Sequence, residues 1–359
     1  MQESPEKPDV NLAALIARIA SRANLSTHDA EDAFVEVMEG RASPVQVAAL
    51  LVALRAKGEA PSEIAGGVRA LRRAMIPVAA PADWTIVDTC GTGGGAVTTF
   101  NISTAAALLA AGAGVRIAKH GNRSFSSRCG SADVLEALGV KIELTPEQMG
   151  VVLQSTGIVF MFAPLLHPAM RHVAPVRREL AMPTVMNVLG PLANPAGARR
   201  QIVGVSHPAL LDLIAGGLRE LGHERALVVH GQPGLDEISP LGPTTVIELR
   251  NGELDRYEVE PADFGITGCT AEELAGYDPV ENALIVKNVL KGNGSRSARY
   301  ATVMNAGAAI YLADLADTLH DGIAKADAAL NEGKGSEALE RLRVATIATG
   351  SPADVAPHS

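Results

Sequence analysis

The sequence predicts an α/β protein with a small all-helical domain and a larger α/β domain, whose mostly parallel central sheet is flanked by helices. The first eighty residues show only helical spacing of apolar residues. After them, apolar runs of about four to six residues alternate with helical stretches, which is the rhythm of βαβ units. Aromatic residues make up only 3% of the chain, while Ala, Leu and Gly are plentiful, which favours helices and parallel strands over a β-sandwich.

Local signals mark four short helices at the start of the chain. Ser26 or Thr27 caps the second, and Ser43-Pro44 places a capping serine and a first-turn proline at the third. The first shows apolar residues at helical spacing, and Pro61-Ser62 leads into the fourth. The predicted helical ranges are 11–21, 27–38, 44–56 and 61–75. Residues 77–83, rich in Pro and Ala, are interpreted as a linker.

The strand rhythm that follows is interrupted once. Predicted strands are 85–87, 115–118, 141–144, 158–162, 201–205 and 226–229. Between Pro164 and Pro195 proline-punctuated helical segments replace them, so this part is expected to return to the helical domain. Arg250-Asn251-Gly252-Glu253 predicts a hairpin turn, and helices resume from about Glu281. The expected domains are 1–83 with about 164–192 (helical), and 84–163 with 193–359 (α/β).

Composition limits the partners and the compartment. A formal charge of −9 provides no general field that would attract nucleic acid or an anionic membrane. The N-terminus is polar, without the apolar core of a signal peptide, and the apolar runs fall short of a membrane span. Three widely spaced cysteines without a CxxC pattern are typical of free thiols in a reducing cytosol. We therefore expect a cytoplasmic protein without nucleic-acid or membrane partners.

Glycines follow the first predicted strand in a cluster, Gly91-Thr92-Gly93-Gly94-Gly95. Glycine lets the backbone approach a ligand and point N–H groups at it, although a tight structural turn would use the same residues. The cluster lacks the Lys-Ser/Thr of a P-loop and the spacing of a dinucleotide fingerprint. Asn101-Ile102-Ser103-Thr104 then brings an amide and two hydroxyls to a helix start, which favours an anion. Ser103 or Thr104 is also a candidate N-cap.

A second donor-rich stretch, Lys119 to Ser127, follows the second predicted strand. It holds two cations, an imidazole, an amide and three hydroxyls. A solvated loop normally mixes charges of both signs, yet no acid occurs from Thr89 to Ala132, so we interpret the stretch as an anion site. Ser131 begins the next helix as a candidate N-cap that would also reach a phosphate.

Two charged pairs complete the candidate site. Arg177-Arg178 would ordinarily form a solvated face, but in this acid-poor region at least one is expected to reach a carboxylate or phosphate. Asp236-Glu237 suits Mg²⁺ arriving with a polyphosphate, with an exposed acidic turn as the alternative. No Ser/His/Asp or Cys/His set has the signature of a nucleophile, so no side chain is expected to act as nucleophile or general base.

Taken in order, these motifs resemble the anthranilate phosphoribosyltransferase family. The matching segments are GTGG…TFNIST, KHGNRSxSSxxGSADxLEALG, HPAMRHVxPVRREL, NVLGPLANP and LDEIS, within about residues 10–345. The combination is specific, although no single piece is. The resemblance implies a two-domain fold, which nucleoside phosphorylases share. It also implies that the protein is a homodimer. It implies transfer of phosphoribose from 5-phosphoribosyl 1-pyrophosphate (PRPP) to the amino group of anthranilate in tryptophan biosynthesis, with Mg²⁺.

The resemblance also implies which residues bind each component. PRPP would be held by the glycine cluster, the helix start and the second loop, namely Gly91, Gly94, Gly95, Thr99, Asn101, Ile102, Ser103, Thr104, Lys119, His120, Gly121, Asn122, Arg123, Ser124, Phe125, Ser126, Ser127 and Ser131. Anthranilate would contact Gly91, His120, Asn122 and Arg177, the last through its carboxylate, and Mg²⁺ would be held by Ser103, Asp236 and Glu237. An aromatic amine is already a nucleophile, so catalysis would rest on positioning and on stabilising the leaving pyrophosphate.

The chain departs from the family pattern in two places. Gly95 stands where the family normally has Asp, and we expect this to change the Mg²⁺ dependence and PRPP affinity without abolishing turnover. Ala181-Met182-Pro183 replaces the usual Gly-x-Arg, and Met186 replaces a Phe, which affects the local helix end and the acceptor specificity.

Two other functions fit parts of the pattern. A pyrimidine nucleoside phosphorylase shares the architecture and a glycine-rich phosphate loop, but Asn122 with Arg177 and the acidic pair argue against it. A catalytically silent relative that binds nucleic acid should have a basic groove and a degraded metal site, whereas this chain is acidic and keeps Asp236-Glu237.

Overall fold

The computed structural model describes residues 10–124 and 128–349. The chain forms two compact units, one of Met1–Met75 with His167–Ala193 and one of Ile76–Leu166 with Asn194–Ser359. Residues 76–83, which we expected to end the helical domain, belong to the second unit. The N–H groups of Ile76 and Val78 donate to the carbonyls of Leu166 and Pro195 at 2.8 and 3.0 Å. Within the described ranges, no helix combines the length and the apolar character needed to cross a membrane.

The first unit is built only of helices in its described part, and the four predicted N-terminal ones are confirmed. Ser26 and Ser43 cap α2 and α3 as expected, because each side chain accepts a first-turn N–H. Gly66 lets α4 approach α2 closely, since a Cβ there would lie 2.5 Å from the Thr27 carbonyl oxygen. The helices are α1 (Leu12–Ala20), α2 (Thr27–Met38), α3 (Pro44–Lys57), α4 (Pro61–Ala74), the 3₁₀ helix η1 (Pro168–His172), α9 (Ala174–Leu180) and α10 (Met186–Leu192).

A buried carboxylate joins the ends of these helices. Glu63 is fully buried and accepts the N–H groups of Leu25 and Ala60, at 3.0 and 2.8 Å. It also pairs with the Lys57 ammonium group at 2.9 Å, which donates in turn to Asn24. A buried charge is tolerated when it is paired and hydrogen-bonded. Glu63 therefore ties the loop before α2 to the start of α4.

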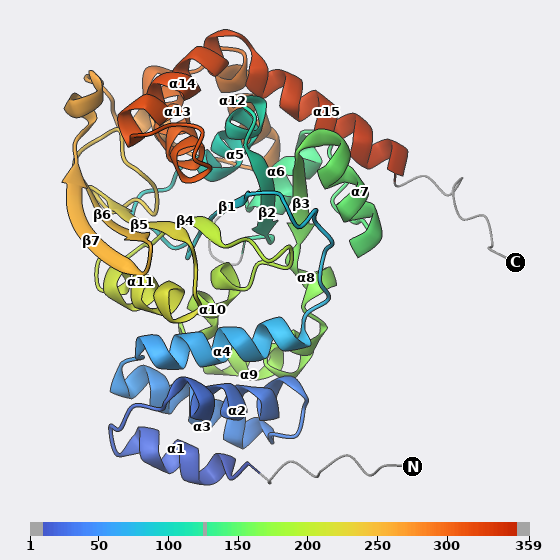
Figure 1. Cartoon of the computed structure of the whole chain (residues 1–359), viewed down its shortest axis with the longest axis vertical. Helices are drawn as coiled ribbons and strands as arrows, with labels where there is room; N and C mark the ends of the chain where they lie inside the picture. Colours follow the sequence, from blue (N-terminus) through green and yellow to red (C-terminus); the bar gives the residue numbers. More distant parts are fainter. Residues whose placement is uncertain (1–9, 125–127, 350–359) are drawn as a thin grey trace, which may run out of the picture. The chain divides into compact units, whose positions relative to one another are not determined.

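The second unit contains a seven-stranded sheet in the order β3-β2-β1-β4-β5-β6-β7 (Figure 1). The first five strands in the chain are parallel, and β6 and β7 add an antiparallel hairpin at one edge. Asn251 and Gly252 turn that hairpin with φ of 53° and 82°, as expected. The strands are β1 (Ile86–Gly91), β2 (Arg116–Gly121), β3 (Ile158–Phe162), β4 (Arg200–Gly204), β5 (Arg225–Gly231), β6 (Thr244–Arg250) and β7 (Glu253–Val259).

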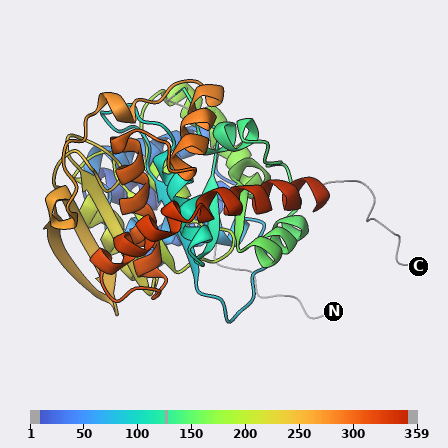
Figure 2. The same ribbon diagram turned by 90° about the horizontal axis from the view of Figure 1, so that it is seen from above.

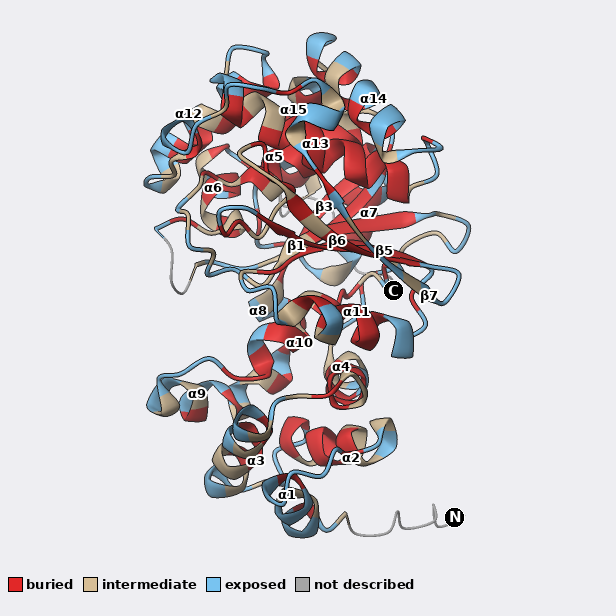
Figure 3. Cartoon of the chain, turned by 90° about the vertical axis from the view of Figure 1, so that its left-hand side faces the viewer, coloured by how far each residue is buried: buried red, intermediate tan, exposed pale blue. Residues whose placement is uncertain are grey.

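Helices cover both faces of this sheet. α5 (Ile102–Gly112) and α13 (Arg296–Leu312) lie on one face, and α11 (Leu210–Glu220) packs on β5 and β6 from the other (Figure 1). α15 (Lys334–Thr349) crosses outside α5 and beside α7 (Pro146–Thr156), as the view in Figure 2 shows. The central strands are buried between these layers (Figure 3). The remaining elements are α6 (Ser131–Ala137), α8 (Ala163–Leu166), η2 (Pro261–Phe264), η3 (Glu272–Leu274), α12 (Pro279–Leu290) and α14 (Leu319–Asn331).

One predicted strand, residues 141–144, is wrong. This segment joins none of the seven described strands, although Ile142 and Leu144 are buried. The Lys141 N–H donates instead to the Thr346 hydroxyl of α15 at 3.2 Å. The alternation of apolar and polar residues arises because an extended segment packs against helices. Such a segment has the same two-residue period as a strand, so the pattern alone does not distinguish them.

One departure from the family pattern, Ala181, lies at the C-terminal end of α9. Ala181 lies at the C-terminal cap with φ of 48°, in the left-handed region where the resemblance would place a glycine. A Cβ in this conformation costs roughly 1–2 kcal/mol, part of which is offset by the lower backbone entropy of the unfolded chain.

We therefore expect Ala181→Gly to raise the free energy of unfolding by about 1 kcal/mol. Ala174→Gly, at the start of the same helix, is the matched control and should lower it, because glycine there gains no conformational relief. Chemical denaturation measures both, and a destabilised Ala181→Gly protein would contradict this account of the helix end.

Candidate active site

Both predicted loops emerge at the same edge of the sheet. β1 and β2 are adjacent and parallel, so Gly91 and Gly121 end their strands on the same side. The carboxyl ends of parallel strands are where α/β proteins bind ligands. In the described part of the chain, the glycine cluster, the start of α5 and the loop after β2 lie around this edge.

Lys119, which lies in β2, connects that strand to β1 and to the start of α5. Its side chain is only 4% exposed, and Nζ donates to the Thr89 carbonyl oxygen in β1 and to the Ser103 hydroxyl of α5 at 3.2 Å. Burial lowers the pKa of Lys119, and the nearby Asp88 carboxylate opposes that shift. The predicted residues Lys119 and Ser103 therefore do meet, at the start of α5.

Asp88 is a buried carboxylate that accepts hydrogen bonds from groups around Lys119. It is fully buried and accepts from the His120 N–H at 3.2 Å and from Asn194 Nδ2 at 2.8 Å, with Gln201 Nε2 at 3.3 Å. Burial raises the pKa of Asp88, while Lys119 and these hydrogen bonds oppose the rise. Asp88, Asn194 and Gln201 are not among the predicted site residues, although Asp88 closely precedes the glycine cluster and Asn194 lies within the NVLGPLANP segment.

The acidic pair is attached to the glycine cluster. Asp236 Oδ2 accepts the Gly93 N–H at 3.1 Å, and the Ala96 N–H donates to the Gly234 carbonyl at 2.9 Å. Close approach requires glycine at two strand ends. A Cβ at Gly204 would lie 1.7 Å from the Asp236 carbonyl oxygen, and one at Gly91 would lie 2.9 Å from its carboxylate. Gly91 is therefore required for close packing against Asp236, whereas the turn itself is made by Gly93 and Gly94, which have φ of 67° and 81°.

A buried asparagine holds the backbone just after this pair. Asn305 of α13 is 2% exposed and accepts the Ile238 N–H at 3.0 Å while donating to the Ile238 carbonyl at 2.9 Å. These two bonds on one residue restrict the position of Glu237, its neighbour. No local sequence signal pointed to Asn305, because its partner lies 67 positions away.

The charges at this edge fit a divalent cation. Desolvation raises the pKa of Glu237 to about 8, with a further rise from Asp236 and opposition from Lys119 and the Ser103 backbone. Desolvation also raises the pKa of Asp236. Two carboxyl groups that resist ionising together are stabilised in the charged form by a bound cation. Residues 10–124 and 128–349 contain no group of three or more His, Cys, Asp or Glu placed for a metal. Mg²⁺ commonly completes its shell with water and substrate phosphates.

The start of α5 contributes unevenly. Asn101 is the N-cap residue, but its side chain does not cap the helix. Ile102 and Thr104 are each 1% exposed, and the Thr104 hydroxyl has no hydrogen-bond partner among the described residues. It borders an internal cavity of about 10 Å³ that Lys119 also lines. The Ile102 and Thr104 side chains therefore face the core, and only Ser103 presents a hydroxyl toward Lys119.

In the second loop, Arg123 forms ion pairs with acidic side chains of α6. Its guanidinium pairs with Asp133 at 2.8 Å and Glu136 at 2.5 Å, both on α6. Those two acids raise the pKa of Arg123, chiefly through their hydrogen bonds. Asn122 Oδ1 accepts the Arg123 N–H at 2.7 Å, and the Ser131 hydroxyl donates to the Asn122 carbonyl at 3.3 Å. Ser124 lies next to Asp133, whereas Phe125, Ser126 and Ser127 lie outside the described residues.

Arg177 belongs to the other unit, on α9. It is partly buried, and burial lowers its pKa. Its Nη2 donates to Asn187 Oδ1 at 3.4 Å, and Asn187 Oδ1 also accepts the Thr184 N–H at 3.1 Å. Arg178, its neighbour, is exposed. The two arginines are thus distinct, because only Arg177 is held by a second side chain in the described part of this unit.

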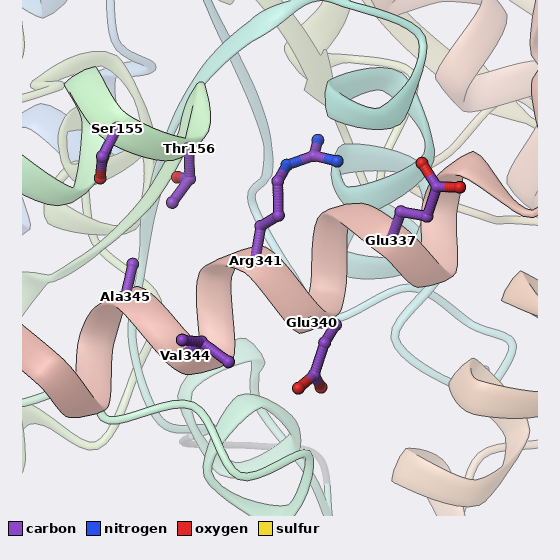
Figure 4. Close-up of a pocket in the computed structure, with 7 residues that line it drawn as sticks. All are labelled: Ser155, Thr156, Glu337, Glu340, Arg341, Val344 and Ala345. Atoms are coloured by element: carbon purple, nitrogen blue, oxygen red, sulfur yellow. The ribbon is translucent and has the colours of Figure 1, made fainter.

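A surface groove lies away from the candidate site. It encloses about 660 Å³ between the end of α7 and α15, and is lined by Ser155, Thr156, Glu337, Glu340, Arg341, Val344 and Ala345 (Figure 4). Thr156 closely precedes β3, so the groove is on the side of the amino ends of the strands. None of the predicted site residues lines it.

Comparison with known proteins extends over nearly the whole chain. The family model described as the glycosyl transferase family a/b domain matches residues 83–336, and the helical bundle domain of the same family matches residues 13–75. Anthranilate phosphoribosyltransferase of Rubrobacter xylanophilus is 52% identical over 327 residues, which are 91% of this chain and 95% of that protein. The enzyme of the same name from Roseiflexus sp. is 50% identical over 328 residues, 91% and 96% of the two chains.

Solved structures agree with the sequence relatives. The crystal structure of anthranilate phosphoribosyltransferase from Thermus thermophilus superposes with a TM-score of 0.87 at 42% identity, covering 92% of this chain and 99% of that one. The Saccharomyces cerevisiae enzyme, in complex with PRPP and Mg, gives a TM-score of 0.84 at 29% identity, covering 95% and 99%. With half of its residues identical to curated members along almost their full length, the chain belongs to the anthranilate phosphoribosyltransferase family.

Proposed function

We propose that this protein transfers the phosphoribosyl group of PRPP to the amino group of anthranilate, giving N-(5-phosphoribosyl)anthranilate and pyrophosphate, in tryptophan biosynthesis. The observation that carries the proposal is the meeting of Lys119, Ser103 and the Asp236–Glu237 pair at one edge of the sheet, in a member of this family. Cation, hydroxyl and carboxylates together suit a magnesium-bound pyrophosphate.

The chain would hold the pyrophosphate by backbone and side-chain donors. The N–H groups of the Gly91–Gly95 loop and of the first turn of α5 are suited to an anion, and α5 is long enough to present a helix dipole. Lys119 adds a positive charge beneath Ser103. A charge pair at 4 Å is worth roughly 4 kcal/mol at an effective dielectric of 20, so several convergent donors matter.

Ser103, Asp236 and Glu237 would hold Mg²⁺. The ion would supply positive charge that stabilises the leaving pyrophosphate. The raised pKa values of Asp236 and Glu237 support this assignment, because a cation lowers the cost of having both groups ionised.

The acceptor would be oriented and need no activation. Arg177 would pair with the anthranilate carboxylate, and Gly91, His120 and Asn122 would contact the ring and its amino group. The Asn187 bond supports the role of Arg177, because it restricts the guanidinium before the ligand arrives. The aromatic amine attacks the anomeric carbon directly as pyrophosphate leaves, so positioning replaces a nucleophilic side chain.

We also propose that the protein is a cytoplasmic homodimer. Exposed apolar side chains on α3, Val45 at 78% and Val52 at 38%, support burial against a second copy. The described residues include all three cysteines and no disulfide, which supports a reducing compartment. Sedimentation velocity tests the dimer, and a species of 37.2 kDa at micromolar concentration would contradict it.

Pyrophosphate release tests the function directly. Purified protein mixed with Mg²⁺, PRPP and anthranilate should release pyrophosphate, and omission of anthranilate or chelation of Mg²⁺ should abolish the release. Release that does not depend on anthranilate, or a nucleoside and phosphate as the only productive pair, would refute the proposal.

Arg177→Ala should raise KM for anthranilate much more than KM for PRPP. Loss of a charge-assisted bidentate contact predicts an increase on the order of tenfold to a hundredfold. Arg178→Ala, at the exposed neighbour, is the matched control and should leave both KM values unchanged. Steady-state kinetics measure KM for each substrate in both variants. An equal rise of the two KM values in Arg177→Ala would contradict the assignment of Arg177.

Gly95→Asp should lower the Mg²⁺ concentration needed for half-maximal activity. A Cβ at this position would lie 3.3 Å from Asp236 Oδ1 and 3.0 Å from the Gly234 carbonyl, so the new carboxylate would begin beside the acidic pair. An added negative charge strengthens cation binding, and we expect a shift of about threefold to tenfold. Gly95→Asn has the same size without the charge, and superimposable Mg²⁺ curves for the Asp and Asn variants would refute the electrostatic explanation.

A further inference from the structure

Asn282 lies in α12, and its side chain is buried. It is not one of the residues proposed above to contact a ligand. It is 1% exposed. Its Oδ1 accepts the Tyr277 N–H at 2.7 Å, and its Nδ2 donates to Asn101 Oδ1 at 3.0 Å. An amide has one accepting and one donating end, so the bond from Tyr277 sets which end faces Asn101.

Asn101 passes this orientation on to the loop after β2. Its Nδ2 donates to the Cys129 carbonyl at 3.2 Å, and its Oδ1 accepts the Cys129 thiol at 3.3 Å. Burial raises the pKa of Cys129 to about 11, so the thiol keeps its proton and donates at neutral pH. A directed chain of hydrogen bonds therefore runs from Tyr277 through Asn282 and Asn101 to Cys129.

The segment before α12 also contacts the backbone that leads into α5. Thr99 forms a β-bridge with Ala275, and the Phe100 N–H donates to the Leu274 carbonyl at 2.9 Å. Gly276 permits this approach, because a Cβ there would lie 2.1 Å from the Thr99 carbonyl oxygen. The backbone of 99–100 is thus already held, and the Asn282 side chain adds control of Asn101.

We propose that Asn282 is a positioning residue for PRPP binding, which orients Asn101 and thereby joins the start of α5 to the loop that follows β2. This inference rests on the proposed function, since both of those segments are proposed to hold PRPP. Asn282 acts through Asn101 and through its own contact with Cys129, and it touches no substrate.

Asn282→Asp is the sharpest variant, because it keeps the shape of the side chain and removes its donor. Its carboxylate would face Asn101 Oδ1, and an Asn101 that turned to compensate would direct Oδ1 at the Cys129 carbonyl. We expect KM for PRPP to rise roughly tenfold, the effect of losing about one buried hydrogen bond. KM for anthranilate should change less. Amide hydrogen exchange should accelerate at 128–130, whereas it should stay unchanged at 99–100, whose bonds to Leu274 and Ala275 do not involve Asn282.

Asn288→Asp is the matched control, since it adds the same charge at an exposed position of α12 and should behave like wild type. If Asn282→Asp does not fold, Asn282→Ala makes the same test without adding a charge. A wild-type KM for PRPP in either folded variant, or equal increases in both KM values, would overturn the inference. A wild-type protein that releases no pyrophosphate from PRPP and anthranilate would instead refute the proposed function.

Discussion

The buried ammonium group of Lys119 is the interaction on which the arrangement of the site depends. Lys119 lies in β2, yet its hydrogen bonds go to Thr89 of β1 and Ser103 of α5. A buried charge is stable only when hydrogen-bonded and paired, so these elements must stay together. Asp88, close enough to oppose the shift in the pKa of Lys119, extends the arrangement to the backbone of β2 and to Asn194.

Close backbone approach is the second constraint, and it explains glycines that a phosphate-binding interpretation leaves unexplained. Gly91 and Gly204 end adjacent strands and leave room for Asp236. Gly93 and Gly94 adopt φ of 67° and 81°, which only glycine adopts readily. The cluster therefore is a structural turn, and its N–H groups are proposed to bind pyrophosphate as well. These two roles are compatible, because a turn held by Asp236 presents its remaining N–H groups in a defined direction.

The cations of the acid-free stretch from Thr89 to Ala132 lie in different surroundings. Arg116 lies at the amino end of β2 and stacks on Trp84, with 4.3 Å between the guanidinium carbon and the ring centroid. Arg123 pairs with Asp133 and Glu136, which lie just beyond the acid-free stretch. Of these three cations, only Lys119 has a described hydrogen bond to the start of α5, which is proposed to hold pyrophosphate. Arg116 and Lys119 are only three residues apart, yet Arg116 lies at the amino end of β2 and Lys119 lies nearer its carboxyl end. Nearness in the sequence therefore does not show which end of a strand a side chain occupies.

Features that depend on neighbouring residues could be predicted from the sequence alone. Helix starts at Ser26 and Ser43 and the hairpin at Asn251-Gly252 follow from local hydrogen bonding and dihedral preferences. Which distant groups share a hydrogen bond became visible only in the folded chain. Asn194 meets Asp88 across 106 positions, and Asn282 meets Asn101 across 181. Such pairs leave no periodic trace, because their geometry is set by the packing of helices on the sheet and not by the residues beside them.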